Sequence, residues 1–182
     1  MSNTSLKPAD IMPSLVVSDV DEKKVDLVDR ISDSPWKMIV VYRGQHCPKC
    51  TAQLNELAKV HKDFKDAGVE VVAVSGDSHE QLNKHLEKID INFPIYYGLT
   101  IEQMTDLGLH ISEPRSDAET DHPFAEPGIF VLNEKNQLQM VDISNTTIQS
   151  EAHLLNNIHF HGFKRHFLVL FLFIFNFFKL IS

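Results

Sequence analysis

Residues 38–50 read MIVVYRGQHCPKC, and this stretch decides the fold. Its first part, 38–42, is a short apolar run rich in β-branched residues, which is typical of a strand buried on both faces. Gly44 interrupts the run, and the two cysteines follow as Cys47-Pro-Lys-Cys50. Beyond them, residues at helical spacing share one largely apolar face: Leu54, Leu57, Ala58, His61 and Phe64. The sequence therefore predicts a CxxC motif at a strand-to-helix junction, which is typical of thiol–disulfide redox proteins.

The position of the cysteines favours a reactive thiolate. An ordinary cysteine has a pKa of about 8.5, so little of it is ionised at neutral pH. The N–H groups and the dipole at a helix N-terminus stabilise an anion by roughly 0.3–1 kcal/mol, and by up to about 2 kcal/mol when partly buried. That lowers the pKa by about one unit, and Arg43 and Lys49 are placed to add to the effect. Cys47 is the predicted nucleophile and Cys50 the predicted resolving cysteine.

The rest of the chain alternates strands and helices. A short hairpin is predicted before the motif strand, at 14–17 and 24–28. After the motif, helices are predicted at 48–67, 78–89, 100–108 and 147–158, strands at 69–75, 93–97, 128–132 and 137–143, and a long polar loop at 110–127. The repeated order of strand and helix implies parallel crossovers and an α/β sandwich.

Composition excludes several classes of function. The formal net charge is −8 and no basic stripe is visible, so we expect no nucleic-acid partner. The chain has two cysteines, both in one motif, which excludes a structural disulfide framework. No glycine-rich phosphate motif is present, so no nucleotide cofactor is implied, and no metal or haem either. The N-terminus lacks the features of a secretory signal, so we expect a cytoplasmic protein.

The two ends of the chain differ in amino-acid composition from its middle. Residues 1–12 are predicted to be a flexible lead-in, 13–159 one domain, and 160–182 a Phe-rich apolar tail with eight of the twelve phenylalanines. As a helix, 167–181 would span about 22 Å, short of the roughly 30 Å hydrocarbon core of a bilayer. Two explanations stay open: an appended end of the kind that an out-of-frame reading produces, or a membrane-seeking segment.

Several motifs together resemble a known family. They are YRGxxCPxC, VEVVAVSGDS (69–78), FPIYYGL (93–99), LGLHIS (107–112) and AEPGIFVLN (125–133). This set, spread over 13–158, resembles the peroxiredoxin-like branch of the alkyl hydroperoxide reductase/thiol-specific antioxidant superfamily. The resemblance implies a thioredoxin-like three-layer sandwich with an N-terminal hairpin. It also implies a thiol-dependent antioxidant oxidoreductase that reduces peroxides or disulfides and is itself reduced by a thiol system such as thioredoxin or glutathione.

The resemblance also assigns individual residues. Pro127 matches the position of a cis-proline that packs against the CxxC in thioredoxin-like proteins. Typical peroxiredoxins carry a threonine or serine three residues before the reactive cysteine, where its hydroxyl orients the peroxide. Here that position is Gly44. The resemblance therefore supports the fold more strongly than it supports peroxidase activity.

The remaining candidates have alternative interpretations. Tyr42 and Arg43 end the motif strand and are candidate substrate and thiolate contacts, although Arg43 equally suits a structural ion pair. His46 adjoins Cys47 and as an imidazolium would stabilise the thiolate. His61 is interpreted as a core-edge histidine rather than a base. The acidic residues and the histidine at 117–122 are interpreted as a solvated loop, not a calcium site.

Two alternatives to redox catalysis stay open at this point. The CxxC motif also spaces two zinc ligands, but no second ligand pair with such spacing stands near it. The other alternative is a thioredoxin-fold scaffold module with vestigial thiols, held at a membrane by the tail. An unperturbed pKa of Cys47 would favour the scaffold.

Overall fold

The computed structural model describes residues 6–116 and 118–143 of the 182-residue chain. The helix predicted at 147–158 and the apolar tail lie outside these residues, so the predictions about them stay predictions. No helix within the described part is both long and apolar enough to cross a membrane.

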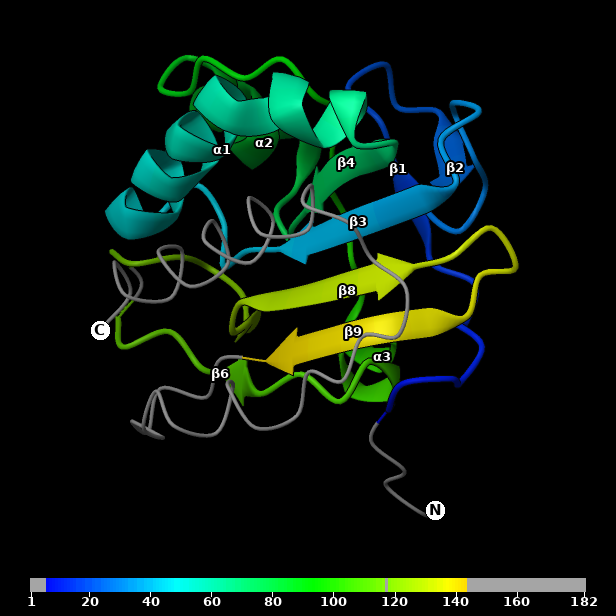
Figure 1. Cartoon of the computed structure of the whole chain (residues 1–182). Coiled ribbons are helices and arrows are strands. Elements are labelled where there is room, and N and C mark those ends of the chain that lie inside the picture. Colours follow the sequence, from blue (N-terminus) through cyan, green and yellow to red (C-terminus); the bar gives the residue numbers. More distant parts are fainter. Residues whose placement is uncertain (1–5, 117, 144–182) are drawn as a thin grey trace, which may run out of the picture.

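A mixed sheet forms the centre of the fold (Figure 1). Within the described residues its five strands have the order β5-β4-β3-β8-β9. Their bounds are β3 Trp36–Val41, β4 Val69–Val74, β5 Ile95–Tyr96, β8 Gly128–Leu132 and β9 Leu138–Ile143. Strands β3, β4 and β5 are parallel, whereas β8 is antiparallel to β3 and β9 to β8. The parallel crossovers expected from the sequence are confirmed.

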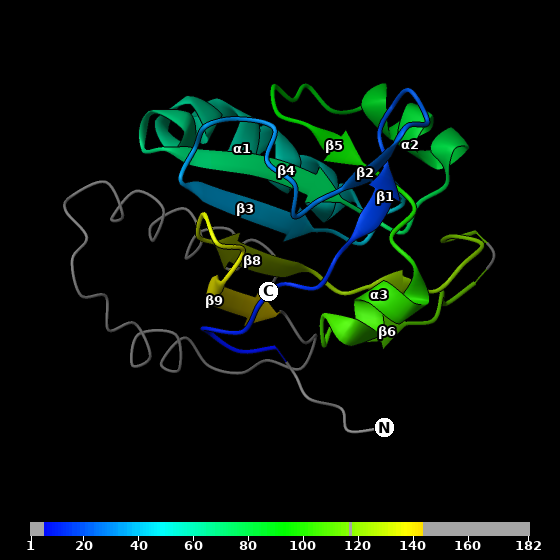
Figure 2. The same cartoon turned by 90° about the vertical axis from the view of Figure 1, so that its right-hand side faces the viewer.

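Helices cover the sheet on both faces, which gives three layers (Figure 2). Helix α1 (Pro48–Asp66) and helix α2 (His79–Leu86) lie on one face, and helix α3 (Ile101–Asp106) lies on the other with the hairpin of β1 (Val16–Ser18) and β2 (Lys24–Asp26). Successive residues of β3 enter the two cores in turn: Met38 and Val40 pack under α1, and Ile39 and Val41 pack on the opposite side. Burial on both faces explains the unbroken apolar run.

The ends of three strands meet at one edge of the sheet. Val41 pairs with Val74 at the ends of β3 and β4, and it also pairs with Gly128 at the start of β8. The segments after β3 and β4 and the segment before β8 therefore converge there. The CxxC motif lies in the first of these segments, so this edge of the sheet holds the candidate site.

The predicted long loop at 110–127 contains two short strands. Strand β6 (Ile111–Ser112) pairs with β7 (Phe124–Ala125) in an antiparallel ladder. Strands of two residues are too short to produce an alternating pattern in the sequence, so the prediction of an unstructured loop was wrong at both its ends. Helix α2 also ends three residues before the predicted boundary.

The N-terminal segment is part of the domain from its first described residues. The Ala9 N–H donates to the Leu138 carbonyl at 2.8 Å, and the Leu138 N–H donates to the Asp10 carbonyl at 2.8 Å. Met12 is buried in the core beside the hairpin. For these residues the structure differs from the predicted flexible lead-in, because backbone pairing with β9 holds them.

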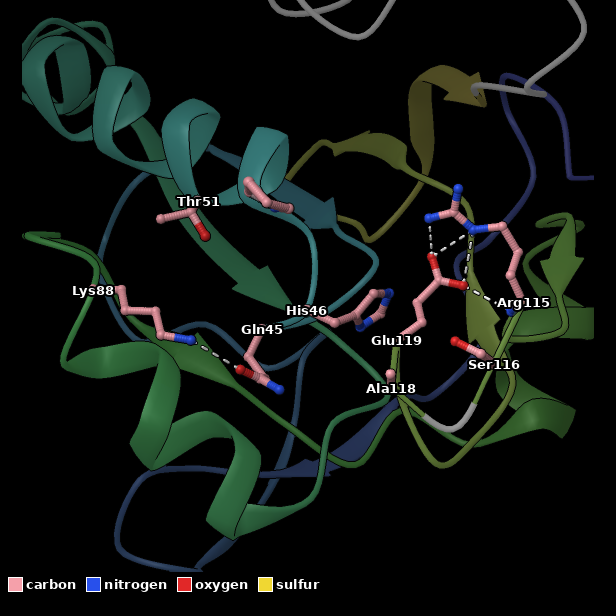
Figure 3. A pocket seen from close by; sticks show the side chains of 9 residues that line it. Gln45, His46, Thr51, Lys88, Arg115, Ser116, Ala118 and Glu119 are labelled. Atoms are coloured by element: carbon pink, nitrogen blue, oxygen red, sulfur yellow. Dashed lines mark hydrogen bonds and ion pairs between the residues drawn. The ribbon is translucent and has the colours of Figure 1, made fainter.

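A pocket of about 670 Å³ opens at the edge that carries the motif. Figure 3 shows residues that line it from three parts of the chain: the turn and first turn of α1, the residue stretch after α2, and the segment between β6 and β7. They include Gln45, His46, Pro48, Thr51, Lys88 and Arg115. The pocket therefore borders the motif turn at Gln45 and His46.

Candidate active site

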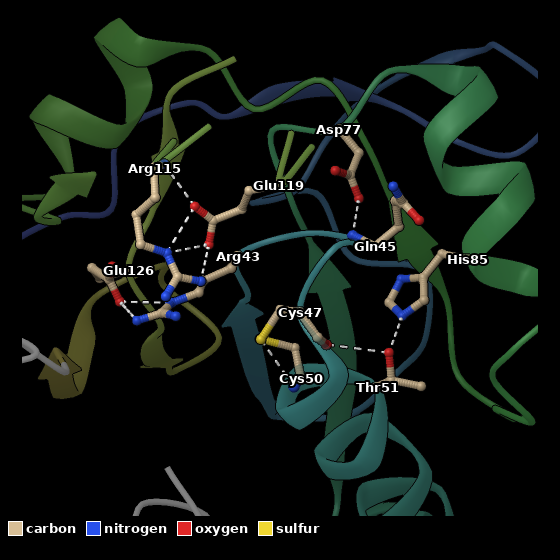
Figure 4. Close-up of a disulfide and its surroundings, with 10 residues drawn as sticks. All are labelled: Arg43, Gln45, Cys47, Cys50, Thr51, Asp77, His85, Arg115, Glu119 and Glu126. Carbon is tan, nitrogen blue, oxygen red and sulfur yellow. Dashed lines mark hydrogen bonds and ion pairs between the residues drawn. A yellow bond between two sulfur atoms is a disulfide. The ribbon is translucent and has the colours of Figure 1, made fainter. Parts of the chain in front are cut away.

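Cys47 and Cys50 form a disulfide at the start of α1 (Figure 4). Their Cα atoms are 5.3 Å apart. Cys47 is the N-cap residue, with extended backbone, and its sulfur accepts the N–H of Cys50 at 3.2 Å. Pro48 follows at the first helical position, where its missing N–H costs nothing. The predicted CxxC at a strand-to-helix junction is confirmed.

The same geometry suits a thiolate in the reduced protein. The N-cap position places the Cys47 sulfur among the free N–H groups of the first helical turn, which favour a negative charge. Cys47 is 8% exposed and Cys50 is 2% exposed, so Cys47 is the one that an incoming oxidant reaches more easily. These observations fit Cys47 as nucleophile and Cys50 as resolving residue.

Arg43 forms an ion pair rather than pointing freely at the sulfurs. Its Nε and Nη2 atoms donate to Oε2 of Glu126 at 2.9 and 2.7 Å. The other carboxylate oxygen of Glu126 accepts from the Ser112 hydroxyl at 2.6 Å, and Glu126 is buried. Of the two roles left open by the sequence, the structure shows the ion pair, which joins the motif strand to the residue before Pro127.

Pro127 lies buried immediately before β8, at the same edge as the motif. No cis peptide bond occurs among the described residues, so the Glu126–Pro127 bond is trans and the implied cis-proline is wrong. The trans form is the favoured one for a prolyl bond by about 0.5–1 kcal/mol. The backbone and side chain of Glu126 are held by its N–H bond to the His110 carbonyl and by the ion pair with Arg43.

Tyr42 is buried rather than exposed at the pocket. Its ring centroid lies 5.5 Å from that of His85, and burial, followed by the charge of Asp77, raises the pKa of the phenol far above its usual value. The side chain is therefore a neutral group beneath the motif turn. A direct contact between Tyr42 and a substrate stays a prediction.

His46 lines the pocket, but as a neutral ring. It packs against Phe124 with the ring centroids 4.6 Å apart. Burial is the largest influence and lowers the pKa of His46, and the neighbouring Glu119 opposes this only in part. The neutral imidazole is therefore favoured at pH 7. The predicted role as a thiolate-stabilising imidazolium does not fit this environment.

Asp77 is a site residue that the sequence did not reveal. It follows β4, is fully buried, and accepts the N–H of Gln45 through Oδ2 at 2.9 Å. This bond ties the turn before Cys47 to the neighbouring parallel strand. Burial raises the pKa of the Asp77 carboxyl. The available signal was its place after a buried parallel strand, because such strands end at the same edge.

Asp77 also explains the glycine where the family carries a hydroxyl. Gly44 has φ of +142°, and a Cβ atom there would collide with Oδ1 of Asp77 and lie 3.1 Å from Nδ1 of His46. A side chain at this position is excluded by both the backbone conformation and the carboxylate. The carboxyl group of Asp77 is thus a polar neighbour of the turn at Gly44 and Gln45.

Thr51 and His85, also missed in the sequence, support the first turn of α1. The Thr51 hydroxyl donates to the Cys47 carbonyl at 3.3 Å, and Nε2 of His85 lies 3.0 Å from the same hydroxyl. His85 is fully buried. Burial, with smaller contributions from Lys88 and His46, lowers the pKa of His85 to about 4.

His85 therefore predicts acid sensitivity of the fold. Its pKa falls from 6.5 to about 4 on folding, so the unfolded chain binds the proton more readily and stability is lost as pH falls through that range. The loss attributable to His85 is at most about 3 kcal/mol. Denaturant titrations at about pH 7 and pH 4 measure the free energy of unfolding. The difference in the free energy of unfolding between the two pH values should shrink in His85→Gln. It should persist in His79→Gln, a variant on the same helix.

The contacts of two further titratable residues, His61 and Glu119, suit a structural role. His61 packs edge-on against Phe93, and burial lowers its pKa, as suits a histidine at the core edge. Glu119 pairs with Arg115 at 2.6 Å, which lowers the pKa of the Glu119 carboxyl to about 2. Across 6–116 and 118–143, no three His, Cys, Asp or Glu side chains are grouped so that they could hold a metal ion.

Comparison with known proteins identifies the family. The sequence model of the AhpC/TSA family matches residues 8–141. The chain belongs to the AhpC/TSA family. The matched region contains both cysteines, Asp77, and the strands β3, β4 and β8 that position them. The peroxiredoxin-like, thioredoxin-type fold expected from the motifs is thereby confirmed.

The curated proteins that are similar in sequence to this chain include both peroxiredoxins and thiol-disulfide oxidoreductases. The chain is 32% identical over 90 residues to the peroxiredoxin Bcp of Escherichia coli (strain K12), covering 50% of this chain and 56% of that protein. It is 31% identical over 85 residues to the thiol-disulfide oxidoreductase ResA of Bacillus subtilis (strain 168), covering 46% and 45%. The matches thus span about half the length of these relatives.

Solved structures agree on the fold. A mutant of the peroxiredoxin 6 of Arenicola marina superposes with a TM-score of 0.64 and 20% identity, covering 83% of this chain and 71% of that chain. At that identity the likeness concerns the fold alone. The names of the two curated relatives, a peroxiredoxin and a thiol-disulfide oxidoreductase, denote thiol-dependent redox chemistry. A CxxC pair at a helix start can perform this chemistry.

Proposed function

We propose that this protein is a dithiol–disulfide oxidoreductase that uses Cys47 and Cys50 to reduce peroxides or disulfides. The observation that carries the proposal is the Cys47 sulfur at the N-cap of α1, bonded to Cys50, while the residues on either side of Cys47, His46 and Pro48, line a pocket. The family and the relatives named above support thiol-dependent redox chemistry.

The proposed cycle has three steps. The Cys47 thiolate attacks an oxygen of a peroxide or a sulfur of a disulfide, and the O–O or S–S bond breaks. Cys50 then attacks the sulfenic acid or mixed disulfide on Cys47, which releases water or a thiol and forms the bond seen in the structure. An external thiol system, such as thioredoxin or glutathione, reduces the pair again. A cytoplasmic location, where such systems operate, is part of the proposal.

The pocket favours a small polar oxidant. Its lining carries the cation of Lys88, whose Nζ donates to the Gln45 side chain at 3.2 Å, and hydroxyl groups from Thr51 and Ser116. A site for a long acyl chain would instead be lined mainly by apolar side chains. Because residue 44 is a glycine, it provides no hydroxyl to orient a peroxide. We therefore treat disulfides and peroxides equally as candidate oxidants.

Intact-mass measurement tests the proposal directly. Reduced protein is mixed with an equimolar amount of hydrogen peroxide or of a small linear disulfide, quenched with acid, and weighed. Loss of two hydrogen atoms, reversed by added thiol, is the expected result with at least one oxidant. A non-catalytic scaffold would instead show unchanged mass or slow oxidation that continues past the disulfide.

A further inference from the structure

One positive charge on the pocket lining has no partner of opposite charge. The ammonium of Lys88, an exposed residue just after α2, donates to Oε1 of Gln45 at 3.2 Å (Figure 3). Within residues 6–116 and 118–143, Lys88 forms no ion pair with a carboxylate. An amide oxygen is a neutral acceptor, so the Lys88 charge stays uncompensated.

The other ionisable side chains of the lining contribute no net charge. The Arg115 guanidinium donates to Glu119 through Nε, 3.1 Å from both carboxylate oxygens, and through Nη2 at 2.6 Å. Burial lowers the pKa of His46, so this ring is neutral at pH 7. The lining thus carries one net positive charge in a chain whose formal net charge is −8. Such a distribution draws a small anion toward the pocket, because the acidic remainder of the protein repels it.

Hydrogen bonds fix the position of Lys88 relative to the cysteine pair. The Lys88 N–H donates to the His85 carbonyl at 2.8 Å, and Nε2 of His85 lies 3.0 Å from the Thr51 hydroxyl. Thr51 in turn donates to the Cys47 carbonyl at 3.3 Å. The backbone of Lys88 is therefore tied to the first turn of α1, which keeps its side chain at the pocket beside the motif turn.

Gln45 adds a second donor to the first. Its Oε1 accepts from Lys88, so its Nε2 is the end that carries two N–H groups. In the described part of the chain these N–H groups have no hydrogen-bond partner. The Gln45 backbone is held by donation of its N–H to Asp77 at 2.9 Å. A carboxylate has two acceptor oxygens, so it can take one bond from the Lys88 ammonium and one from the Gln45 amide.

We propose that Lys88 and Gln45 form a seat for a carboxylate group, and that the favoured oxidant is a small disulfide that carries one. This inference rests on the proposed function, because it names the substrate class of the same cysteine pair. The hydroxyl groups of Thr51 and Ser116 suit the polar remainder of such a substrate. Lys88 is then a specificity-determining residue that lies far from the CxxC motif in the sequence.

The seat leaves the redox chemistry of the cysteine pair unchanged. The Cys47 thiolate attacks one sulfur of the disulfide, the S–S bond breaks, and the first thiol of the substrate leaves. Cys50 then attacks the Cys47 sulfur of the mixed disulfide, and the second thiol leaves. The two electrons lost by the cysteine pair reduce the two sulfurs of the substrate, and the two protons given up by the cysteines balance those on the released thiols.

Three disulfides of similar size and different charge test the seat. They are dithiodipropionate, hydroxyethyl disulfide and cystamine, which carry carboxylate, hydroxyl and ammonium groups. Rapid mixing with reduced protein at pH 7, followed by intact-mass measurement, gives the rate with each. In Lys88→Gln, the rate with dithiodipropionate divided by the rate with hydroxyethyl disulfide should fall about three- to fivefold, the worth of one exposed ion pair. The intrinsic reactivities of the two oxidants cancel in this comparison between variants.

Further variants make the comparison specific to the pocket. Lys88→Glu should shift the preference toward cystamine, whereas Lys88→Arg should retain the preference for dithiodipropionate, since a guanidinium keeps the charge. Gln45→Leu, which removes the second donor, should also lower the ratio. Lys84→Gln is the matched control: it removes the same charge one helical turn earlier, outside the pocket lining, where Lys84 pairs with Glu80 at 2.7 Å. It should leave the ratio unchanged.

The outcomes separate the carboxylate seat from the proposed function. A lower ratio in Lys88→Gln that is absent in Lys84→Gln supports the seat. Equal ratios in the wild type, Lys88→Gln and Lys88→Glu overturn it and leave the proposed function intact. An equal fall in Lys88→Gln and Lys84→Gln also overturns it, because the ratio then reports the net charge of the protein. A wild-type Cys47 that reacts no faster than a free thiol with all three disulfides and with hydrogen peroxide contradicts the proposed function itself.

Discussion

Replacing Cys50 by serine is expected to stop turnover while leaving the first reaction of Cys47 intact. Cys47 keeps its N-cap position and the N–H of residue 50, because this bond comes from the backbone. Without the second thiol the intermediate cannot close to a disulfide. The variant should therefore accumulate a sulfenic acid or a mixed disulfide on Cys47, detectable by mass, and lose steady-state turnover by about a hundredfold or more.

Cys47→Ser is the matched control for this result. It removes the nucleophile, so both the first reaction and turnover should be lost and no adduct should form at Cys50, which is almost fully buried. Adducts on Cys50 in Cys47→Ser, together with unchanged first-step rates, would reverse the assigned roles of the two cysteines.

The second large effect concerns stability, at a buried ion pair between β3 and β4. The Lys37 ammonium lies 2.7 Å from the Glu70 carboxylate, with side chains only 2% and 4% exposed. Lys37 also donates to the Leu27 carbonyl at 2.9 Å, and Glu70 accepts from the Ser32 hydroxyl at 2.7 Å. The pair thus fastens the segment after β2 to the central sheet.

Glu70→Gln should destabilise the fold by about 3–5 kcal/mol, because it leaves the Lys37 charge buried without its counter-charge. The double variant Lys37→Met with Glu70→Leu should recover most of that loss, since no charge then remains buried. Denaturant unfolding of the two variants beside the wild type measures both values. A loss below about 1 kcal/mol in Glu70→Gln, as at a surface pair, would contradict this account.

The strands and helices that the sequence predicted share a clear physical signal. The strands β3 and β4 are buried on both faces, so apolar residues fill every position apart from the paired Lys37 and Glu70. Helix α2 begins at a capping box built from Ser78 and Gln81, residues at the start of the predicted helix range. The strands β6 and β7 were missed because two residues carry no periodicity, and the N-terminal pairing with β9 was missed because it links distant parts of the chain.

The sequence predicted only those site residues that lie in the contiguous stretch around the two cysteines. The two cysteines, their junction and the pocket residue His46 follow from one contiguous stretch. Asp77 lies thirty residues away and becomes a neighbour only through the parallel pairing of β3 with β4. The trans bond before Pro127 and the neutral state of His46 depend on packing, which the residue types alone do not determine.

The most direct test of the account is the rate at which reduced protein loses Cys47 thiol to hydrogen peroxide and to a small disulfide at pH 7. A free thiol of known pKa and the Cys47→Ser variant serve as references. We predict a rate well above that of the free thiol with at least one oxidant, and its complete loss in Cys47→Ser. Rates equal to the free thiol with both oxidants would contradict the central claim that the start of α1 activates Cys47.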